Sequence, residues 1–399
     1  MKRNMIENVP LDVIVEILIR LPARTLLRFK RVCNSWRSLI SDPFFIDFHL
    51  KFSSSTPDTL IMKKNRKRKK KKNINGIEES FFFAANPSWR EKFCFLCNHG
   101  PSQIDFPSRE ANSSVSFQLV SSCNGLVSLW YPADLHQPVS LWNPSTMETH
   151  ILPFSGVANF CPVQVGFGFH RLAAGPGDYK VVIISLSNEL NPLVKFNTLV
   201  YSLRMDSWKQ IDNSNLPQNM VPGYYSEQVW LNGSVHWLTN HSGDRGRYVS
   251  VLSFNMADET FREMSLPQNI FSKEKLMGAA EGRLCVVAYN FYATKDVEVW
   301  VMKEYGVGEF WTKLFVISPP ERWGADGNVL RPVGVTRSGQ VVLKRRKKGR
   351  LVLISYDPKR KVFEGFGNWV FGSDTAESIE SLVSVTASLV SVAPGSLYS

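Results

Sequence analysis

The segment LNGSVHWL (residues 231–238), which is followed by VLSFNMADETFREMSLP (251–267), is the clearest indication of the fold. Gly233 suits a tight hairpin turn whose backbone needs a positive φ, because glycine has no Cβ to clash in that conformation. Apolar residues at alternating positions before the turn, such as Val229 and Leu231, are typical of a half-buried strand. These features predict short antiparallel strands joined by tight turns.

The same order of features recurs along the chain. Each unit has a turn with glycine, an apolar strand, a second strand that ends in an aromatic residue and Asn or Asp, and a third strand with Trp or Phe. Units of about 50 residues that cannot bury their faces alone stack radially as a β-propeller. Five units are visible, and weaker strands over 59–62, 79–85, 93–97 and 115–120 indicate one more, so we expect about six blades, in a range of five to seven. The five units cover 123–153, 178–211, 231–267, 281–314 and 338–366, and their turn glycines are Gly125, Gly233, Gly282 and Gly339.

The first fifty residues instead predict three short helices, which makes the chain mainly β with a small α domain. Pro10 stands where a helix start tolerates proline, and Pro22 ends that first helix. A second helix is expected over 24–29, and a third from Asn34, a good N-cap, until Pro43 stops it. So short a segment has too little interior for all its apolar side chains. Some of them should therefore face another protein, since burying each is worth roughly 1.5 to 3 kcal/mol.

These N-terminal residues resemble the F-box over about forty positions. The one departure is Val9, an apolar residue where the family usually has Leu. The resemblance implies docking on a Skp-type adaptor, which links to a cullin RING ubiquitin ligase. The matching positions are Pro10, Glu16-Ile17-Leu18, Arg20-Leu21-Pro22, Leu26-Leu27, Val32-Cys33, Trp36 and Asp42-Pro43. By carry-over, the candidates for helix packing and adaptor contact are Pro10, Ile14, Ile17, Leu18, Leu21, Pro22, Leu26, Leu27, Val32 and Trp36.

Two other interpretations of these helices remain open. They could form a small subdomain that only packs on its own C-terminal neighbour. They could also form a basic helix-turn-helix, although the helix NSWRSLI (34–40) offers few polar side chains for base edges.

The repeated units resemble the F-box-associated domain, often described as kelch-like, which follows the F-box in a large plant group. The matches are SCNGLV (122–127), WNPST (142–146), GFGF (166–169) leading to DYKVV (178–182), WLNGSVHWL (230–238) and IESLVS (379–384). The two resemblances imply an F-box at 1–50, a linker at 51–57 and a propeller at 58–399. The basic loop that we expect at 63–78 within this propeller is a departure from the family pattern. They imply a non-catalytic, substrate-recognition subunit of an SCF-type ubiquitin ligase that recruits a target protein.

The basic stretch KKNRKRKKKK (63–72) dominates the charge of the chain. The formal net charge is +12, and residues 1–72 carry 18 basic and six acidic side chains, so the remainder is formally neutral. We expect an exposed hairpin loop, with a nuclear-import signal and a nucleic-acid contact as alternatives. The residues concerned are Lys63, Lys64, Arg66, Lys67, Arg68, Lys69, Lys70, Lys71 and Lys72. A basic nucleic-acid-binding or glycan-binding propeller is the alternative function.

The aromatic loops WYP, GYY and NFY are candidates for a target-binding surface, because propeller loops gather at the two ends of the central channel. The alternative is that they pack between blades. The residues concerned are Trp130, Tyr131, Tyr224, Tyr225, Phe291 and Tyr292. His236, beside Trp237, is expected to be a hydrogen-bonded packing residue.

Catalytic, cofactor and metal motifs are not evident. Cys94, Cys97 and His99 form a lone CxxCxH, whereas a structural zinc site needs four ligands. The six cysteines lack the spacing of a secreted scaffold, and no apolar segment reaches the length of a membrane span. We therefore expect no enzyme activity, no cofactor and no membrane partner, and a location in the nucleus or cytoplasm.

Overall fold

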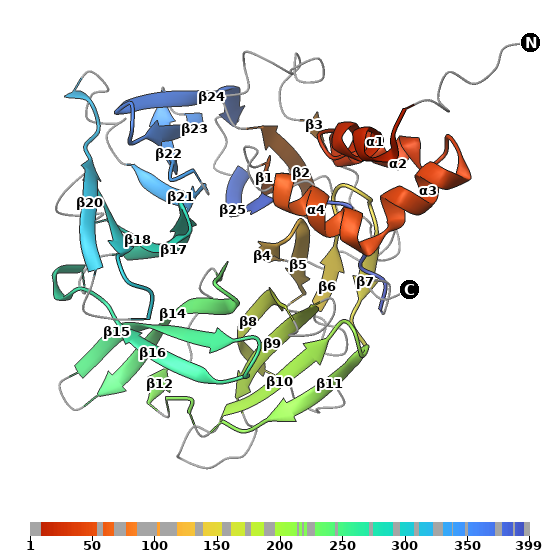
Figure 1. Ribbon diagram of the computed structural model, residues 1–399. Helices are drawn as coiled ribbons and strands as arrows, with labels where there is room; N and C mark the ends of the chain where they lie inside the picture. Colours follow the sequence, from red (N-terminus) through yellow and green to blue (C-terminus); the bar gives the residue numbers. More distant parts are fainter. Residues whose placement is uncertain are drawn as a thin grey trace, which may run out of the picture.

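The computed structural model describes most of the chain in segments. They are residues 9–53, 59–67, 77–85, 102–103, 118–131, 139–153, 161–171, 177–186, 196–213, 215–217, 219–221, 228–243, 246–270, 274–289, 296–306, 311–321, 330–336, 338–347, 350–371, 377–385 and 388–394. Antiparallel sheets form a ring, and a group of helices lies against one side of it (Figure 1). The predicted class, mainly β with a small α domain, is confirmed.

Five sheets are built from consecutive strands, and a sixth joins the two ends of the chain, within the part that the structure describes. The first strands of neighbouring sheets contact one another, β25 with β4 and β4 with β8, as expected for blades around an axis. The strands are β4 (Gln118–Cys123), β5 (Leu126–Trp130), β6 (Val139–Trp142) and β7 (Thr149–Ile151); β8 (Cys161–His170), β9 (Asp178–Leu186), β10 (Phe196–Ser202) and β11 (Ser207–Ile211); β12 (Met220–Val221), β13 (Val229–Leu231), β14 (Ser234–Gly243), β15 (Gly246–Asn255) and β16 (Phe261–Ser265); β17 (Glu274–Ala280), β18 (Arg283–Tyr289), β19 (Val297–Met302) and β20 (Trp311–Ile317); β21 (Arg331–Val335), β22 (Val341–Lys347), β23 (Arg350–Asp357) and β24 (Val362–Phe371); and β25 (Glu377–Val385) with β1 (Thr59–Lys67), β2 (Ile77–Ala85) and β3 (Ser102–Gln103).

Two kinds of turn repeat from blade to blade. In three blades the hairpin turn before the second strand has positive φ at two successive residues, for example Asn232 at 51° and Gly233 at 73°. That is the backbone of a type I′ hairpin, which favours Asn-Gly. All four glycines predicted for these turns have positive φ, between 73° and 84°. The prediction that these glycines lie in turns that need positive φ is therefore confirmed.

The turn between the third and fourth strands is fixed by a side chain. The carboxamide Oδ1 of Asn255 accepts hydrogen bonds from the backbone N–H groups of Ala257 (2.8 Å) and Asp258 (3.4 Å). Asn143 does the same with Ser145 and Thr146, at 2.8 and 3.3 Å. Such Asx turns explain why each unit carries Asn or Asp after its aromatic strand.

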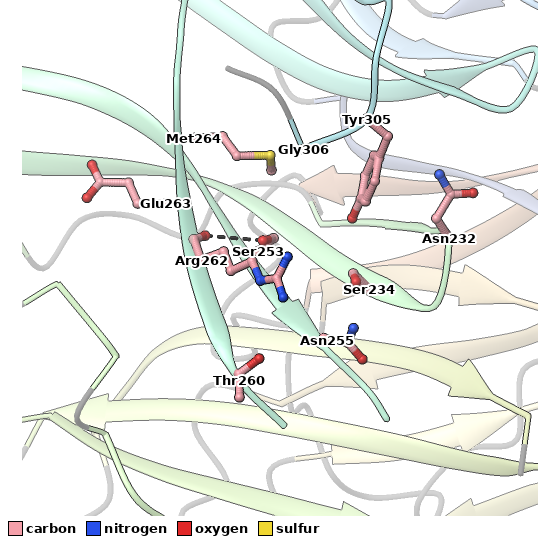
Figure 2. A pocket seen from close by; sticks show the side chains of 10 residues that line it. All are labelled: Asn232, Ser234, Ser253, Asn255, Thr260, Arg262, Glu263, Met264, Tyr305 and Gly306. Carbon is pink, nitrogen blue, oxygen red and sulfur yellow. Dashed lines mark hydrogen bonds between the residues drawn. The ribbon is translucent and has the colours of Figure 1, made fainter. Parts of the chain in front are cut away.

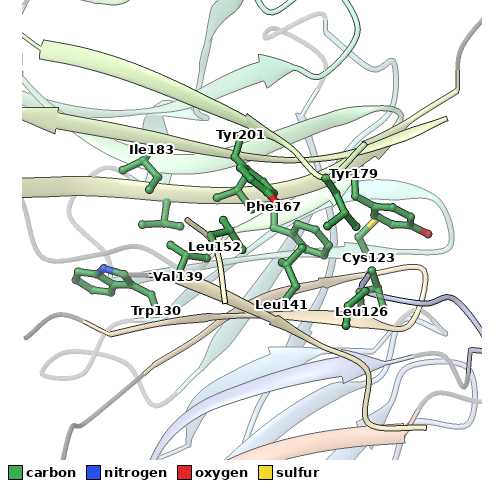
Figure 3. Close-up of a cluster of buried hydrophobic side chains, with 14 of the residues drawn as sticks. Cys123, Leu126, Trp130, Val139, Leu141, Leu152, Phe167, Tyr179, Ile183 and Tyr201 are labelled. Carbon is green, nitrogen blue, oxygen red and sulfur yellow. The ribbon is translucent and has the colours of Figure 1, made fainter. Parts of the chain in front are cut away.

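The core lies between adjacent blades. In Figure 3, Trp130, Val139 and Leu141 from one sheet face Phe167 and Tyr201 from the next. One blade further, the indole N–H of buried Trp237 donates to the carbonyl of Val165 (2.9 Å). Gly166 leaves room for that indole, because a Cβ there would lie 2.4 Å from the Trp237 ring. Interlocking of this kind holds successive blades in register.

The helical domain has four helices rather than the three predicted. They are α1 (Leu11–Leu18), α2 (Ala23–Phe29), α3 (Asn34–Ser41) and α4 (Pro43–Ser53). Asp42 explains the difference, since its carboxylate accepts hydrogen bonds from the backbone N–H groups of Phe44 (2.8 Å) and Phe45 (3.1 Å). The Asp42-Pro43 pair therefore ends α3 and also caps a new helix. As a result, α4 continues three residues into the segment predicted as a linker.

The predicted loop at 63–78 is shorter in the structure. Strand β1 continues through Lys67, and β2 begins at Ile77. In the register of this closing sheet Arg66 lies opposite Glu78 on one side and Glu377 on the other. The strand predicted at 115–120 belongs to a different sheet from the one expected, because residues 118–120 are part of β4 in the β4–β7 sheet.

Candidate functional site

The helical domain leaves much of its apolar surface exposed. Among the described residues, its large apolar side chains that are at least 40% exposed are Val9, Leu11, Val13, Ile17, Val32, Phe44, Phe48 and Phe52. Val13 and Ile17 are four residues apart and so lie on one face of α1. The exposed fraction is 55% at Ile17 and 63% at Val32. Exposed apolar side chains at this density are typical of a protein-binding surface.

Helix α4 has three distinct faces. Phe45 and His49 are buried toward the other helices, where His49 Nε2–H donates to the carbonyl of Leu21 (2.9 Å). Burial lowers the pKa of His49, and the backbone hydrogen bond offsets part of that shift. Ile46 and Leu50 pack against the propeller core. The third face carries Phe44, Phe48 and Phe52, which the sequence analysis missed although their spacing of four residues is a helical signal.

The ten predicted adaptor residues divide into three groups by exposure. Leu18 and Leu26 are buried at 1% and 0% exposure, so their role in the free protein is packing. Ile14, Leu21, Leu27 and Trp36 are partly buried against the same core. The exposed members, which are available for contact, are Pro10, Ile17, Pro22 and Val32.

A strap from the C-terminal region, residues 388–392, joins the helices to the propeller. Leu389 packs in the helical core, while Val390 and Val392 pack in the core of the β4–β7 sheet. The amide Nδ2 of Asn143 donates to the carbonyls of Ser388 (3.2 Å) and Val390 (2.6 Å). The strap therefore holds the helices, with their exposed apolar side chains, in a fixed position on the propeller. The motif WNPST, recognised only by resemblance, thus acquires a physical role.

An ion pair also links the helices directly to the propeller, and it is more exposed than the strap. Asp47 on α4 pairs with Arg171 (2.6 Å) in the turn after β8, and also with Lys51 (2.8 Å) on its own helix. Burial would raise the pKa of Asp47, but the hydrogen bonds and charges of these two cations hold it below its usual range. Arg171 lies between the first and second strands of its sheet, and Asn143 lies between the third and fourth strands of its own. Both kinds of turn are on the same face of the propeller, so the helices lie at that face.

The predicted aromatic surface is not supported where the structure describes it. Trp130 and Tyr131 are 2% and 3% exposed and pack within the propeller. Their WYP segment continues the buried strand β5, so the side chains face the interior and cannot form a target-binding surface. Tyr224, Tyr225, Phe291 and Tyr292 lie outside the described residues, as do Arg68 to Lys72 and the CxxCxH group.

A polar pocket of about 460 Å³ opens between two blades (Figure 2). The first blade contributes the β13–β14 turn, the ends of β14 and β15, and β16, and the second contributes the turn after β19. These turns belong to the same propeller face as the helices. The lining residues are Asn232, Ser234, Ser253, Asn255, Thr260, Arg262, Glu263, Met264, Tyr305 and Gly306.

His236 lies behind this pocket and orients Tyr305. Its Nδ1 is 3.0 Å from the carbonyl oxygen of Val229, which can only accept, so Nδ1 carries the proton. Nε2 is then the acceptor for the Tyr305 hydroxyl, at 2.7 Å. Burial lowers the pKa of His236 to about 4, so the ring is neutral near pH 7. The prediction that His236 is a hydrogen-bonded packing residue is confirmed.

In the described segments no group of three or more His, Cys, Asp or Glu side chains is placed to hold a metal ion. None of the helices in the described part of the chain has the length and apolar character needed to cross a membrane.

Comparison with known proteins identifies related families for both regions of the chain. The model of the F-box associated beta propeller domain matches residues 95–389, and that of the F-box domain matches residues 6–47. The F-box/kelch-repeat protein At3g23880 of Arabidopsis thaliana is 30% identical over 78% of this chain and 79% of its own length. F-box protein CPR1 of the same plant is 26% identical over 88% of this chain and 83% of its own. Among solved structures, TolB from Acinetobacter baumannii superposes with a TM-score of 0.46 at 10% identity, over 82% of this chain and 66% of that one.

Proposed function

This chain belongs to the F-box proteins that carry an F-box associated beta propeller domain, and from that premise we propose that it is the substrate-recognition subunit of an SCF-type ubiquitin ligase. The helices bind a Skp-type adaptor, and through it a cullin, while the propeller holds a target protein for ubiquitination. The subunit itself is non-catalytic. Its contribution is to raise the effective concentration of the target beside the ubiquitin-charged partner.

One observation carries this proposal, namely the exposed apolar side chains of the helical domain. Ile17 and Val32, both more than half exposed, would lose their contact with water on binding an adaptor. Transfer of each such side chain out of water is worth roughly 1.5 to 3 kcal/mol. The strap holds these helices on the propeller, so that a bound target and a bound adaptor would keep a fixed separation.

The test is binding of the full chain to a purified Skp-type adaptor, measured by isothermal titration calorimetry. We expect the Ile17→Asp, Val32→Asp double variant to weaken binding at least a hundredfold, because two charges would be desolvated in an apolar interface. Leu314→Asp is the matched control, since Leu314 is 48% exposed on the propeller strand β20. Binding by the double variant as tight as that of the control would refute the proposal. Leu18 is unsuitable, because a charge at a buried position would unfold the helices.

The location of the protein is a separate part of the proposal. We place it in the nucleus or the cytoplasm and assign the basic stretch 63–72 as a nuclear-import signal. Its density of Lys and Arg supports that assignment. A fluorescent reporter fused to residues 55–80 should accumulate in nuclei, and a variant with alanine at Arg66 to Lys70 should not. A reporter that stays cytoplasmic would remove the import role.

A further inference from the structure

The pocket between the β12–β16 and β17–β20 sheets has an uneven supply of hydrogen-bonding groups. Its single cation, Arg262, makes no hydrogen bond or ion pair through its guanidinium with any residue in the described segments. Figure 2 shows this guanidinium directed into the pocket, toward Asn255 and Ser234. An arginine fork placed in this way offers two parallel N–H donors in one plane.

Asn255 adds a second donor to the same space. Its Oδ1 is occupied by the backbone N–H groups of Ala257 and Asp258, so the amide cannot turn its oxygen toward the pocket without breaking the Asx turn. The Nδ2 group, with two N–H bonds, is therefore the part that faces Arg262. Arg262 and Asn255 together present several donors to one region.

The acid that lines the pocket does not neutralise Arg262. The side chain of Glu263 extends away from that of Arg262, as expected for successive residues of a strand. Its Oε1 lies 3.7 Å from Nε2 of His241 instead. The charge inside the pocket is thus one unpaired positive charge.

The opposite wall is fixed and accepts rather than donates. The Tyr305 hydroxyl gives its proton to Nε2 of His236, which leaves only acceptor capacity toward the pocket. Burial raises the pKa of Tyr305, and Ser234 and the charge of Arg262 offset part of that increase, so the phenol stays protonated. A ligand would therefore meet donors on the Arg262 side and a rigid aromatic wall on the Tyr305 side.

We propose that this pocket binds the side-chain carboxylate of an Asp or Glu residue on the target protein. Two carboxylate oxygens match the guanidinium fork and the Asn255 amide. The Tyr305 ring and Met264 supply apolar contact for the adjoining methylene groups. The volume of about 460 Å³ accommodates such a side chain with part of its neighbours. This assignment rests on the proposed function, and it deepens it by naming the chemistry that the target presents.

The position of the pocket suits this role. It opens on the propeller face that also carries the helical domain, separated from it along the ring by the β8–β11 sheet. A target bound there would lie on the same side of the propeller as the adaptor.

The test starts from the full chain bound to its Skp-type adaptor and a phage-displayed library of random twelve-residue peptides. We expect selected peptides to share Asp or Glu at one position. One such peptide, synthesised with an amidated C-terminus so that only side-chain carboxylates remain, is then measured by fluorescence anisotropy. Arg262→Gln should weaken it at least about tenfold, and Arg262→Lys should weaken it less because the charge remains.

Arg247→Gln is the control, since Arg247 is exposed at the opposite end of the same sheet. Replacing the shared Glu of the peptide by Gln should weaken binding by the same factor as Arg262→Gln does. Replacing it by phosphoserine should not tighten binding. Selection of peptides without a shared acid, failure to select any peptide, tighter binding of the phosphopeptide, or equal binding by Arg262→Gln would each overturn the proposal. Adaptor binding is measured in parallel, and its retention by every variant separates such a failure from failure of the proposed function.

Discussion

The helical domain and the propeller treat their apolar side chains in opposite ways. Of the large apolar side chains exposed in the described residues, eight lie within residues 9–52, and only six lie in the much longer remainder. The propeller buries its apolar strands between neighbouring blades, whereas four short helices cannot enclose theirs. The two binding surfaces that we propose therefore differ in kind. The helices offer apolar area, and the propeller, whose strands are already covered, offers polar groups such as Arg262.

The largest effect should come from opening the core between blades. Trp237→Ala removes a fully buried indole and its hydrogen bond to Val165. We expect the propeller to lose about 3 to 5 kcal/mol of unfolding free energy. Calorimetric melting gives the loss, and adaptor binding at about 10 °C, well below any transition expected for a mesophilic domain, should stay within twofold of wild type. Loss of adaptor binding in a folded Trp237→Ala protein would break the distinction between the two regions.

Within the helical domain, buried and exposed positions should respond in opposite ways. Leu26→Ala at a fully buried site should cost about 2 to 5 kcal/mol. Ile17→Ala, at 55% exposure, should change stability by no more than about 0.5 kcal/mol and yet weaken adaptor binding. Chemical denaturation followed by circular dichroism, together with titration calorimetry, measures both. Equal destabilisation by the two substitutions would mean that the exposed face is part of the fold.

Each region also contains a buried histidine, and acid should destabilise both. The pKa of His236 is lowered from 6.5 to about 4, so the unfolded chain binds more protons between those values. Its contribution is therefore complete above about pH 6.5 and declines as the pH falls toward 4, by roughly 3 kcal/mol in all. His49 in α4 should act in the same direction.

The measurement is the free energy of unfolding across about pH 4 to 7 for wild type, His236→Gln and His49→Gln. Each variant should show a shallower slope than wild type in this range. A slope unchanged by His236→Gln would contradict the neutral, buried state of that ring.

The smallest effects should come from the links between the two regions. Asn143→Ala removes the hydrogen bonds to the carbonyls of Ser388 and Val390 and should cost about 1 to 3 kcal/mol. Faster amide exchange at Val390 and Val392 would report release of the strap. Arg171→Ala is the comparison, because its ion pair with Asp47 is exposed and worth roughly 0 to 1 kcal/mol. A larger loss from Arg171→Ala would reverse this ranking of the two links.

The propeller could be predicted from sequence because its signals are local. Gly233 and its counterparts mark turns that need positive φ, and a short, largely apolar strand follows each of them. The closing sheet could not be seen in the same way, because β25 pairs with β1 from the other end of the chain. The length of β1 also could not be predicted, because the residues that lie opposite Arg66 belong to two other strands.

The candidate sites could be predicted only in part. The apolar surplus of the helices was visible, but which side chains it exposes depends on packing, so Leu18 was grouped with Ile17. Phe44 and its partners were missed because Pro43 was treated as an end and not also as a beginning. The pocket was invisible, since Asn255, Arg262 and Tyr305 meet only when two blades stand side by side.

The strap also has a consequence for how the protein is made. Leu389 completes a core that otherwise consists of side chains from residues 14–46, yet the ribosome adds it after all the blade strands. During synthesis the first helices therefore emerge without their final packing partner. A chain released before Leu389 would carry a weakened helical core, even where β25 had already closed the ring. With the adaptor binding proposed above, such a truncated chain would compete poorly for the adaptor. The fold thereby makes the helical core depend on a residue that follows the last blade strand.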